Sequence, residues 1–218
     1  LYGGDGMIEF PAVTAIHRRL PKEAFYKHLS LTKKLREEFV SDVERILVEN
    51  SFTKENLNLA ADSEIKEIML LSVCLKKQEF DGRVIEAIAK QNPHKLIFLL
   101  VFENSCQLAV WYGKLYRTPW MEKDKVNLKL QGYSIDVVWN SFIEQIALYE
   151  ERATASATLS HSIEDRLMLQ EQILKLEKQI TKTENAMWKE QQPKKKFELH
   201  IELREYKQKL EDLKHGKA

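Results

Sequence analysis

Two stretches of heptad-spaced apolar residues near the carboxyl end, separated by one proline, most constrain the fold of this 218-residue chain. Within each stretch the apolar side chains alternate between steps of four and three, and Thr183 fills one core position. A proline inside a helix costs about 3 kcal/mol or more, so Pro193 favours a turn between two antiparallel helices. We therefore expect a coiled-coil helical hairpin over residues 159–218. Its seam comprises Leu169, Ile173, Leu176, Ile180, Thr183 and Met187, then Leu199, Leu203, Tyr206, Leu210 and Leu213.

Residues 7–150 follow a different pattern, which predicts one compact domain with a mixed sheet. Short apolar runs rich in β-branched residues indicate strands at 46–52, 64–77, 95–102 and 106–112. The run at 64–77 is apolar almost without interruption, so both of its faces should be covered, as in a central strand. A polar turn separates the last two runs, which should form a hairpin.

The helices of this domain are indicated by helical spacing of apolar residues, with a capping residue or a proline in the first turn. They are expected to begin at Pro21, at Thr32, near residue 81 and at Ser134. The third lies between two strands and is a crossover helix. The second carries an inward stripe made of Leu35, Phe39, Val43 and Ile46.

Three other segments complete the organisation of the chain. Residues 125–131 alternate between apolar and polar side chains, which predicts an edge strand with one wet face. Residues 151–158 are small and polar and are interpreted as a connector. Residues 1–6 hold three of the seven glycines and precede Met7, so we interpret them as a leader or a tag remnant. The expected fold class is α/β, or α+β-like: a mixed central sheet flanked by helices, followed by the hairpin.

Composition narrows the classes of partner and cofactor. The chain has 34 Lys and Arg against 33 Asp and Glu, so its total charge favours neither a polyanion nor a membrane. Its longest apolar run, residues 96–102, is far shorter than the ~20 residues that span a bilayer. Cys74 and Cys106 fall on predicted buried strands, where a free thiol packs as a small hydrophobic group. Two cysteines and no visible signal peptide indicate a reduced, cytoplasmic protein.

Histidine and glycine spacing gives no sign of a metal or cofactor site. The six histidines show no metal-binding spacing, and the glycines after Met7 are isolated, so no phosphate-binding loop is present in the sequence. We expect no metal, no bound cofactor and no ATPase or dinucleotide chemistry, and we assign no catalytic residue.

The order helix, strand, strand, helix, strand, strand over residues 32–112 is similar to the core of restriction endonucleases. That core holds Mg²⁺ with a carboxylate on one strand and an acidic-x-Lys motif on the next. The corresponding motif here is Cys74-Leu75-Lys76, which keeps the lysine and lacks the acid. Other acids nearby lack the required spacing: Glu49, Glu64, Glu67, Glu79 and Asp81. A nuclease, active or degenerate, is the alternative to a non-enzymatic protein.

The hairpin carries two kinds of candidate contact residue. Lys194, Lys195 and Lys196 at the turn, with Trp188 nearby, could contact a nucleic-acid backbone and an exposed base. The alternative is a solubilising loop. Four apolar residues lie off the seam and would each gain about 1.5–3 kcal/mol from burial, which favours a second copy or a partner helix as their cover. They are Ile163, Leu167, Ile201 and Trp188.

Three sequence stretches carry a resemblance to a known family. They are Leu20-Pro21-Lys22-Glu23-Ala24-Phe25-Tyr26, Leu75-Lys76-Lys77-Gln78-Glu79-Phe80-Asp81 and Glu190-Gln191-Gln192-Pro193-Lys194-Lys195-Lys196-Phe197-Glu198-Leu199. From Met7 to about Leu213 the chain resembles a bacterial family defined by a domain of unknown function. Some members are labelled methyl-accepting chemotaxis proteins, and their genes tend to lie beside helicase and DNA-methyltransferase genes.

This resemblance implies a genome-defence setting and carries over no catalytic motif. A chemotaxis receptor also needs a transmembrane anchor, which no apolar run of this sequence provides. Together with the hairpin, these features predict a non-enzymatic accessory or protein-interaction subunit. A nucleic-acid-binding module remains as a further alternative.

Overall fold

The computed structural model describes residues 8–23, 29–149 and 162–214. Contacts divide the chain into two compact units, residues 1–156 and residues 157–218, and each is described by itself. The expected leader at 1–6, the expected connector at 151–158 and most of the helix expected from Pro21 lie outside the described residues. None of the helices that the structure describes is long and apolar enough to cross a membrane.

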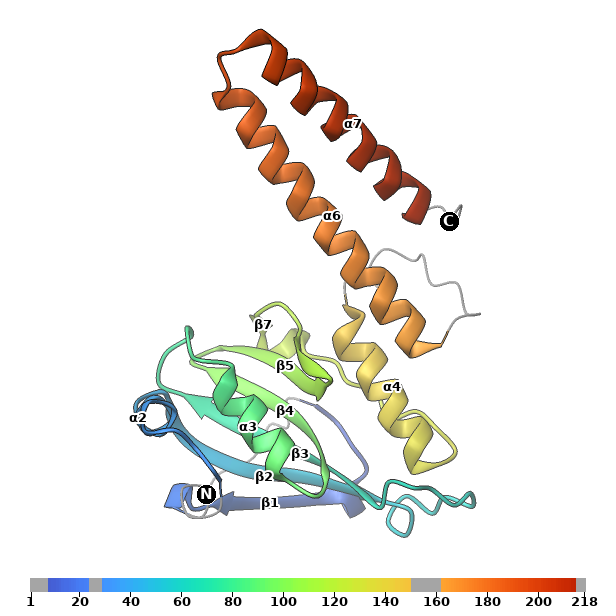
Figure 1. Cartoon of the computed structure of the whole chain (residues 1–218). Helices are drawn as coiled ribbons and strands as arrows, with labels where there is room; N and C mark the ends of the chain where they lie inside the picture. The colour runs from blue at the N-terminus through green and yellow to red at the C-terminus, as the bar shows by residue number, and fades with distance from the viewer. Residues whose placement is uncertain (1–7, 24–28, 150–161, 215–218) are drawn as a thin grey trace. The chain divides into compact units, whose positions relative to one another are not determined.

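The first unit is built on a mixed sheet in which seven strands are described (Figure 1). The strand order is β1-β2-β3-β4-β5-β6, with β7 also paired to β5. Only β3 and β4 are parallel, and the crossover helix α3 joins them; the other pairs are antiparallel. The strands are β1 (Ala15–Leu20), β2 (Val43–Thr53), β3 (Glu67–Leu75), β4 (Lys95–Phe102), β5 (Ser105–Tyr112), β6 (Lys114–Arg117) and β7 (Met121–Glu122).

Three described α-helices cover this sheet: α2 (Lys33–Asp42), α3 (Arg83–Gln91) and α4 (Ile135–Ala147). Two short 3₁₀ helices, η1 (Ala12–Thr14) and η2 (Lys123–Lys125), lie in the connections. The expected caps are present, because Thr32 Oγ1 accepts from the Leu35 amide and Ser134 Oγ accepts from the Val137 amide, both at 3.3 Å. These caps satisfy amide groups that have no partner inside the helix.

The sheet separates two apolar layers because alternate residues of a strand point to opposite faces. On one face, Phe39 of α2 and Ile85 of α3 belong to the same buried cluster as Leu71 and Val73 of β3. On the other face, the ring of Phe142 in α4 lies 5.5 Å from that of Phe52 in β2. Strand β3 is buried along most of its length between β2 and β4, which confirms that it is a central strand.

The structure corrects two local predictions. The helix after Thr32 ends at Asp42, and Val43 and Ile46 belong to β2 and not to the helical stripe. Residues 125–131 are not a strand. Val126 and Leu128 are buried as the alternation suggested, but the side chain of Gln145 replaces a neighbouring strand: its Oε1 accepts from the Lys129 amide and its Nε2 donates to the Lys129 carbonyl, both at 2.8 Å.

The second unit is the predicted hairpin of two long helices, α6 (Ile163–Lys189) and α7 (Pro193–Lys214). The chain turns between them at Glu190-Gln191-Gln192, and Pro193 is the first residue of α7, where its missing N–H costs nothing. Buried seam residues include Ile180, Thr183 and Leu203. Two ion pairs join the antiparallel helices, Lys207 to Glu184 at 2.7 Å and Lys214 to Glu177 at 2.9 Å.

Leu169 is the exception in the predicted seam. Its side chain is 39% exposed although it follows the heptad spacing. Lys214, the last described residue of α7, binds Glu177, so the described part of α7 ends two turns short of Leu169. The amino-terminal turns of α6 therefore extend beyond the described part of α7.

Candidate functional site

The carboxyl end of β3 is one candidate site, because ligands of α/β sheets often bind outside the carboxyl ends of strands. Asp42 ends α2 and precedes Val43, which pairs with Leu75 of β3. This register places Asp42 beside Lys77, whose Nζ lies 2.8 Å from Asp42 Oδ1. The Asp42 side chain is only 2% exposed. The hydrogen bond that Lys77 donates to the Asp42 carboxylate raises the pKa of Lys77, which favours the charged form of this lysine.

Asp42 is an acid near this pattern that the spacing in the sequence did not reveal; it is the last residue of α2, immediately before β2, and does not lie on a strand. The second acidic position is filled by Cys74, as the sequence indicated. Arg45 Nε donates to Cys74 Sγ at 3.2 Å. A guanidinium therefore lies where the pattern would place a cation-binding carboxylate. Lys76, the lysine of the motif, donates from Nζ to the Val40 carbonyl at 3.1 Å.

The other acids of this region are also paired with bases. Arg83 binds both carboxylate oxygens of Asp81, and its Nη2 lies 3.8 Å from Glu38 Oε2. The hydrogen bond from Arg83 holds the pKa of Asp81 well below its usual value. Nowhere in the described ranges do three metal-ligating side chains converge.

Of the remaining candidate acids, only Glu79 lies in this region. Glu49 of β2 binds His17 of β1, and Glu67 at the start of β3 binds His94, both at 3.0 Å. Glu67 therefore lies at the opposite end of β3 from Lys76. Glu64 precedes β3 as well, and Glu79 is an exposed residue of the loop after it. The structure does not bring these acids together.

Both cysteines lie in the sheet and are buried, as predicted from the strands that contain them. Burial raises the pKa of Cys106 to about 11, so this thiol stays protonated and unreactive near neutral pH. Cys74 is covered by the contact with Arg45. These environments are those of packing residues.

The hairpin contains the other candidate site, and the structure divides the predicted partner residues into two regions. Trp188 is 80% exposed and Ile201 45% exposed near the turn, whereas Leu167 is 6% exposed and Ile163 is half-buried. Leu167 and Trp188 are 21 residues apart on α6, a distance of about 30 Å along the helix axis. The four predicted residues therefore do not form one surface.

Near the turn, sequence reasoning missed an apolar residue. Phe197 is 64% exposed in the first turns of α7 and lies one helical turn before Ile201. Residues four apart share a helix face, so these two side chains form an apolar pair. The sequence contained a signal for this pair, because Phe197 and Ile201 are four residues apart and neither belongs to the predicted seam. Lys194, Lys195 and Lys196 are exposed at the start of the same helix, as expected.

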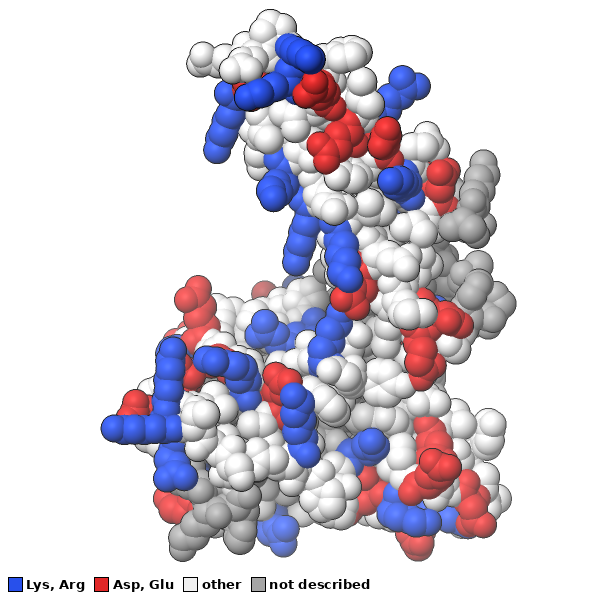
Figure 2. Space-filling view, in the orientation of Figure 1, with Lys and Arg blue, Asp and Glu red and all other residues white. Residues whose placement is uncertain are grey.

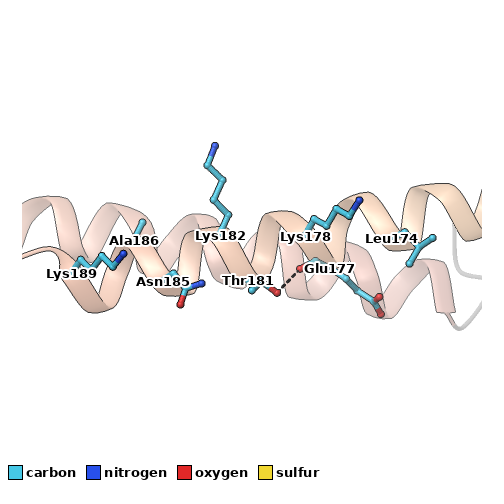
Figure 3. A pocket seen from close by; sticks show the side chains of 8 residues that line it. All are labelled: Leu174, Glu177, Lys178, Thr181, Lys182, Asn185, Ala186 and Lys189. Atoms are coloured by element: carbon cyan, nitrogen blue, oxygen red, sulfur yellow. Dashed lines mark hydrogen bonds between the residues drawn. The ribbon is translucent and has the colours of Figure 1, made fainter. Parts of the chain in front are cut away.

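A groove follows the side of α6 on which the side chains of Figure 3 are drawn. It is open and shallow, with a volume of about 730 Å³. In Figure 3 the side chains of Lys178 and Lys182 extend away from the helix, and Thr181 Oγ1 donates to the Glu177 carbonyl at 2.9 Å. The groove is lined by Leu174, Glu177, Lys178, Thr181, Lys182, Asn185, Ala186 and Lys189.

The protein belongs to the class that combines a mixed α/β domain with a carboxyl-terminal helical hairpin. In its α/β domain, the acidic and basic side chains near the end of β3 form ion pairs. Comparison with family models identifies the family. The model described as a domain of unknown function, DUF4391, matches residues 8–210, and the chain belongs to this family. No curated protein and no solved structure gives a significant match to the chain.

Proposed function

We propose that the protein is a non-enzymatic accessory subunit that binds a helix of a protein partner through the apolar pair Phe197 and Ile201 near the turn of the hairpin. The observation that carries the proposal is that both side chains remain exposed although the seam between α6 and α7 is already filled. Their burial would contribute about 1.5–3 kcal/mol each. A second copy of the chain is the simplest partner, because two-fold symmetry brings identical surfaces together.

The charge pairs at the end of β3 support the non-enzymatic part of the proposal. A Mg²⁺ site needs carboxylates that are free to bind the ion, whereas Asp42 and Asp81 are neutralised by Lys77 and Arg83. Arg45 adds a positive charge beside Cys74, where the nuclease pattern needs an acid. These pairs support a structural role for the residues, at the junction between α2, β3 and α3, and our proposal therefore treats any nuclease-like core here as degenerate.

The nuclease alternative is tested by incubating the full chain with plasmid DNA and Mg²⁺ or Mn²⁺. We expect no cleavage above that of a Lys76→Ala preparation. Metal-dependent cleavage that disappears in Lys76→Ala would overturn the non-enzymatic proposal.

We also propose the genome-defence setting that the resemblance implies, in which the partner would be a protein encoded by the same locus.

The binding proposal is tested with a Phe197→Ser, Ile201→Ser double variant of the full chain. Light scattering should give about twice the chain mass of 25.6 kDa for the unchanged protein and the chain mass for the variant. The matched control changes two other exposed apolar residues, Met168→Ser and Val40→Ser, and should keep the mass of the unchanged protein.

If light scattering shows that the unchanged protein is a monomer, the next experiment is to capture proteins encoded by the same locus with it. Capture that is lost in the double variant and kept in the control supports the proposal. Capture that the two variants affect equally, or no capture, contradicts it.

A further inference from the structure

Between Lys178 and Lys189, the acidic residue of α6 is paired with α7 and the lysines are not. Glu184 is the one acid in this stretch, and it binds Lys207 of α7 at 2.7 Å. Glu177, just before it, binds Lys214 of α7 at 2.9 Å. Both acids are thus paired with lysines of α7, and all other charged residues of α6 from Lys178 to Lys189 are lysines.

The lysines of this outer side form a row. Lys178, Lys182 and Lys189 are exposed, follow steps of four and seven, and line the groove of Figure 3. Residues at these steps share one face of a helix, so the row extends for about 16 Å. None of the three forms an ion pair with any carboxylate that the structure describes. The groove also holds one acid, Glu177, which is bound to Lys214, and the small or neutral residues Thr181, Asn185 and Ala186.

Further exposed lysines lie next to the turn, at the start of α7. Lys194, Lys195 and Lys196 are exposed there and likewise have no carboxylate partner among the described residues. Figure 2 shows blue side chains at the tip of the hairpin and along the side formed by α6. From residue 178 to residue 200 the chain holds six lysines and three glutamates, so this part is basic although the whole chain is nearly neutral.

One aromatic side chain accompanies the lysines. Trp188 precedes Lys189 and is 80% exposed, the most exposed of the large apolar side chains in the described residues. Leaving an indole in water forgoes the burial that a tryptophan usually gains. An indole beside lysines is the combination with which single-stranded nucleic acids are bound, since the ring stacks on a base and the lysines pair with phosphates.

We propose that the outer side of α6 and the adjoining turn bind single-stranded nucleic acid. Lys178, Lys182, Lys189 and Lys194 to Lys196 contact successive phosphates, and Trp188 stacks on an unpaired base. A row of separated cations with little apolar surface between them fits a polymer of regularly spaced phosphates. A membrane would need an apolar stripe along the row, and α6 has only Leu174 and Ala186 there. This binding goes beyond the protein-partner function: its row of lysines lies on α6, and it shares with the partner surface only the start of α7, where Lys194 is on the same face as Phe197 and Ile201.

The salt dependence of binding tests how many phosphates the lysines contact. The full chain is titrated against a fluorescently labelled single-stranded oligonucleotide and a duplex of the same length, with anisotropy measured at several salt concentrations. Six phosphate contacts predict a slope of about −4 for log K against log salt with the single strand. Changing Lys178, Lys182 and Lys189 to Gln removes three contacts and should halve that slope, with at least a tenfold loss of affinity at low salt.

The matched control removes three lysines that are already paired and exposed, Lys34→Gln, Lys125→Gln and Lys175→Gln. It changes the net charge by the same amount and should bind like the unchanged protein. Trp188→Ala should remove the preference for single strand over duplex and keep most of the salt slope. Circular dichroism melting checks that every variant retains its helices.

Three outcomes would overturn the proposal. The first is no oligonucleotide binding by the unchanged protein at low salt. The second is an equal loss in the triple variant and its control, which would reduce the effect to net charge. The third is tighter binding of the duplex than of the single strand, or binding of an acidic peptide or anionic vesicles where the oligonucleotide does not bind.

Discussion

The end of β3 and the outer side of α6 both gather lysines, but they differ in what those lysines contact. At the end of β3, Lys77 binds the buried Asp42, and Arg83 binds Asp81. On α6, Lys178, Lys182 and Lys189 face outward without a carboxylate that the structure describes. A charge that is paired and partly buried stabilises the fold, whereas an unpaired row on a surface is available to a ligand. The first region therefore has the contacts of a structural site, and the second is the one for which we propose a binding role.

The largest expected effect of this difference is on stability. Asp42→Ala removes a buried carboxylate from Lys77 and from Ser41, whose hydroxyl donates to Asp42 at 2.5 Å, and should lower the free energy of unfolding by about 3 kcal/mol. Lys182→Ala should change it by less than about 0.5 kcal/mol, because the side chain is exposed. Urea unfolding followed by circular dichroism measures both. If the two variants lowered the free energy of unfolding equally, the proposed difference between the two regions would be wrong.

A smaller effect is expected from pH. The pKa of Asp81 is lower in the folded protein than in the unfolded chain because Arg83 donates to its carboxylate. The unfolded state therefore binds more protons, and the stability that this pair contributes is present above about pH 4 and is lost as the pH falls below it. Since Arg83 is largely exposed, we expect about 1 kcal/mol.

Urea unfolding of the unchanged protein and of Arg83→Gln at pH 3 and pH 6 isolates this contribution. The variant should lose less stability than the unchanged protein on going to pH 3. An identical loss in both proteins would show that other carboxylates account for the acid sensitivity.

The smallest expected effect concerns the pair that separates acids from lysines on α6. Glu184 and Lys207 are both partly exposed, so a double-mutant cycle with Glu184→Gln and Lys207→Gln should give a coupling free energy of about 0.5 kcal/mol. With this value, the pair would contribute less to the free energy of unfolding than the buried Asp42 and more than the unpaired lysines. A coupling as large as the Asp42 effect would mean that the hairpin also depends on its charges for stability.

The sequence was most informative where one periodicity ran unbroken. The heptads on either side of Pro193 predicted both helices of the hairpin, and the apolar run at 64–77 predicted the central strand. Prediction was poorer where tertiary contacts compete with local pattern. The stripe of Leu35 and Phe39 continued by spacing to Val43 and Ile46, but β-branched residues and pairing with β3 make those two a strand.

Other features left no local signal. Strand β1 is an edge strand whose residues are mostly exposed and include Arg18 and Arg19, and it lacks the apolar alternation that indicates a strand. The pairing of Lys129 with Gln145 depends on the fold of α4, because Gln145 lies in that helix, 16 residues further along the chain. For the candidate sites, Lys194 to Lys196 and Trp188 were evident from the sequence. The row of Lys178, Lys182 and Lys189 became distinct only when the structure showed which acids bind α7.

The most direct test of this assignment is the reactivity of every lysine toward an amine-acylating reagent, measured by mass spectrometry with and without the single-stranded oligonucleotide. We expect Lys178, Lys182, Lys189 and the three lysines at the turn to react rapidly in the free protein and to be protected by the oligonucleotide. Lys77 should react slowly in both conditions, because Asp42 holds it in the charged form. Protection of Lys76 and Lys77 with no change on α6 would instead place the binding site at the end of β3 and contradict the account.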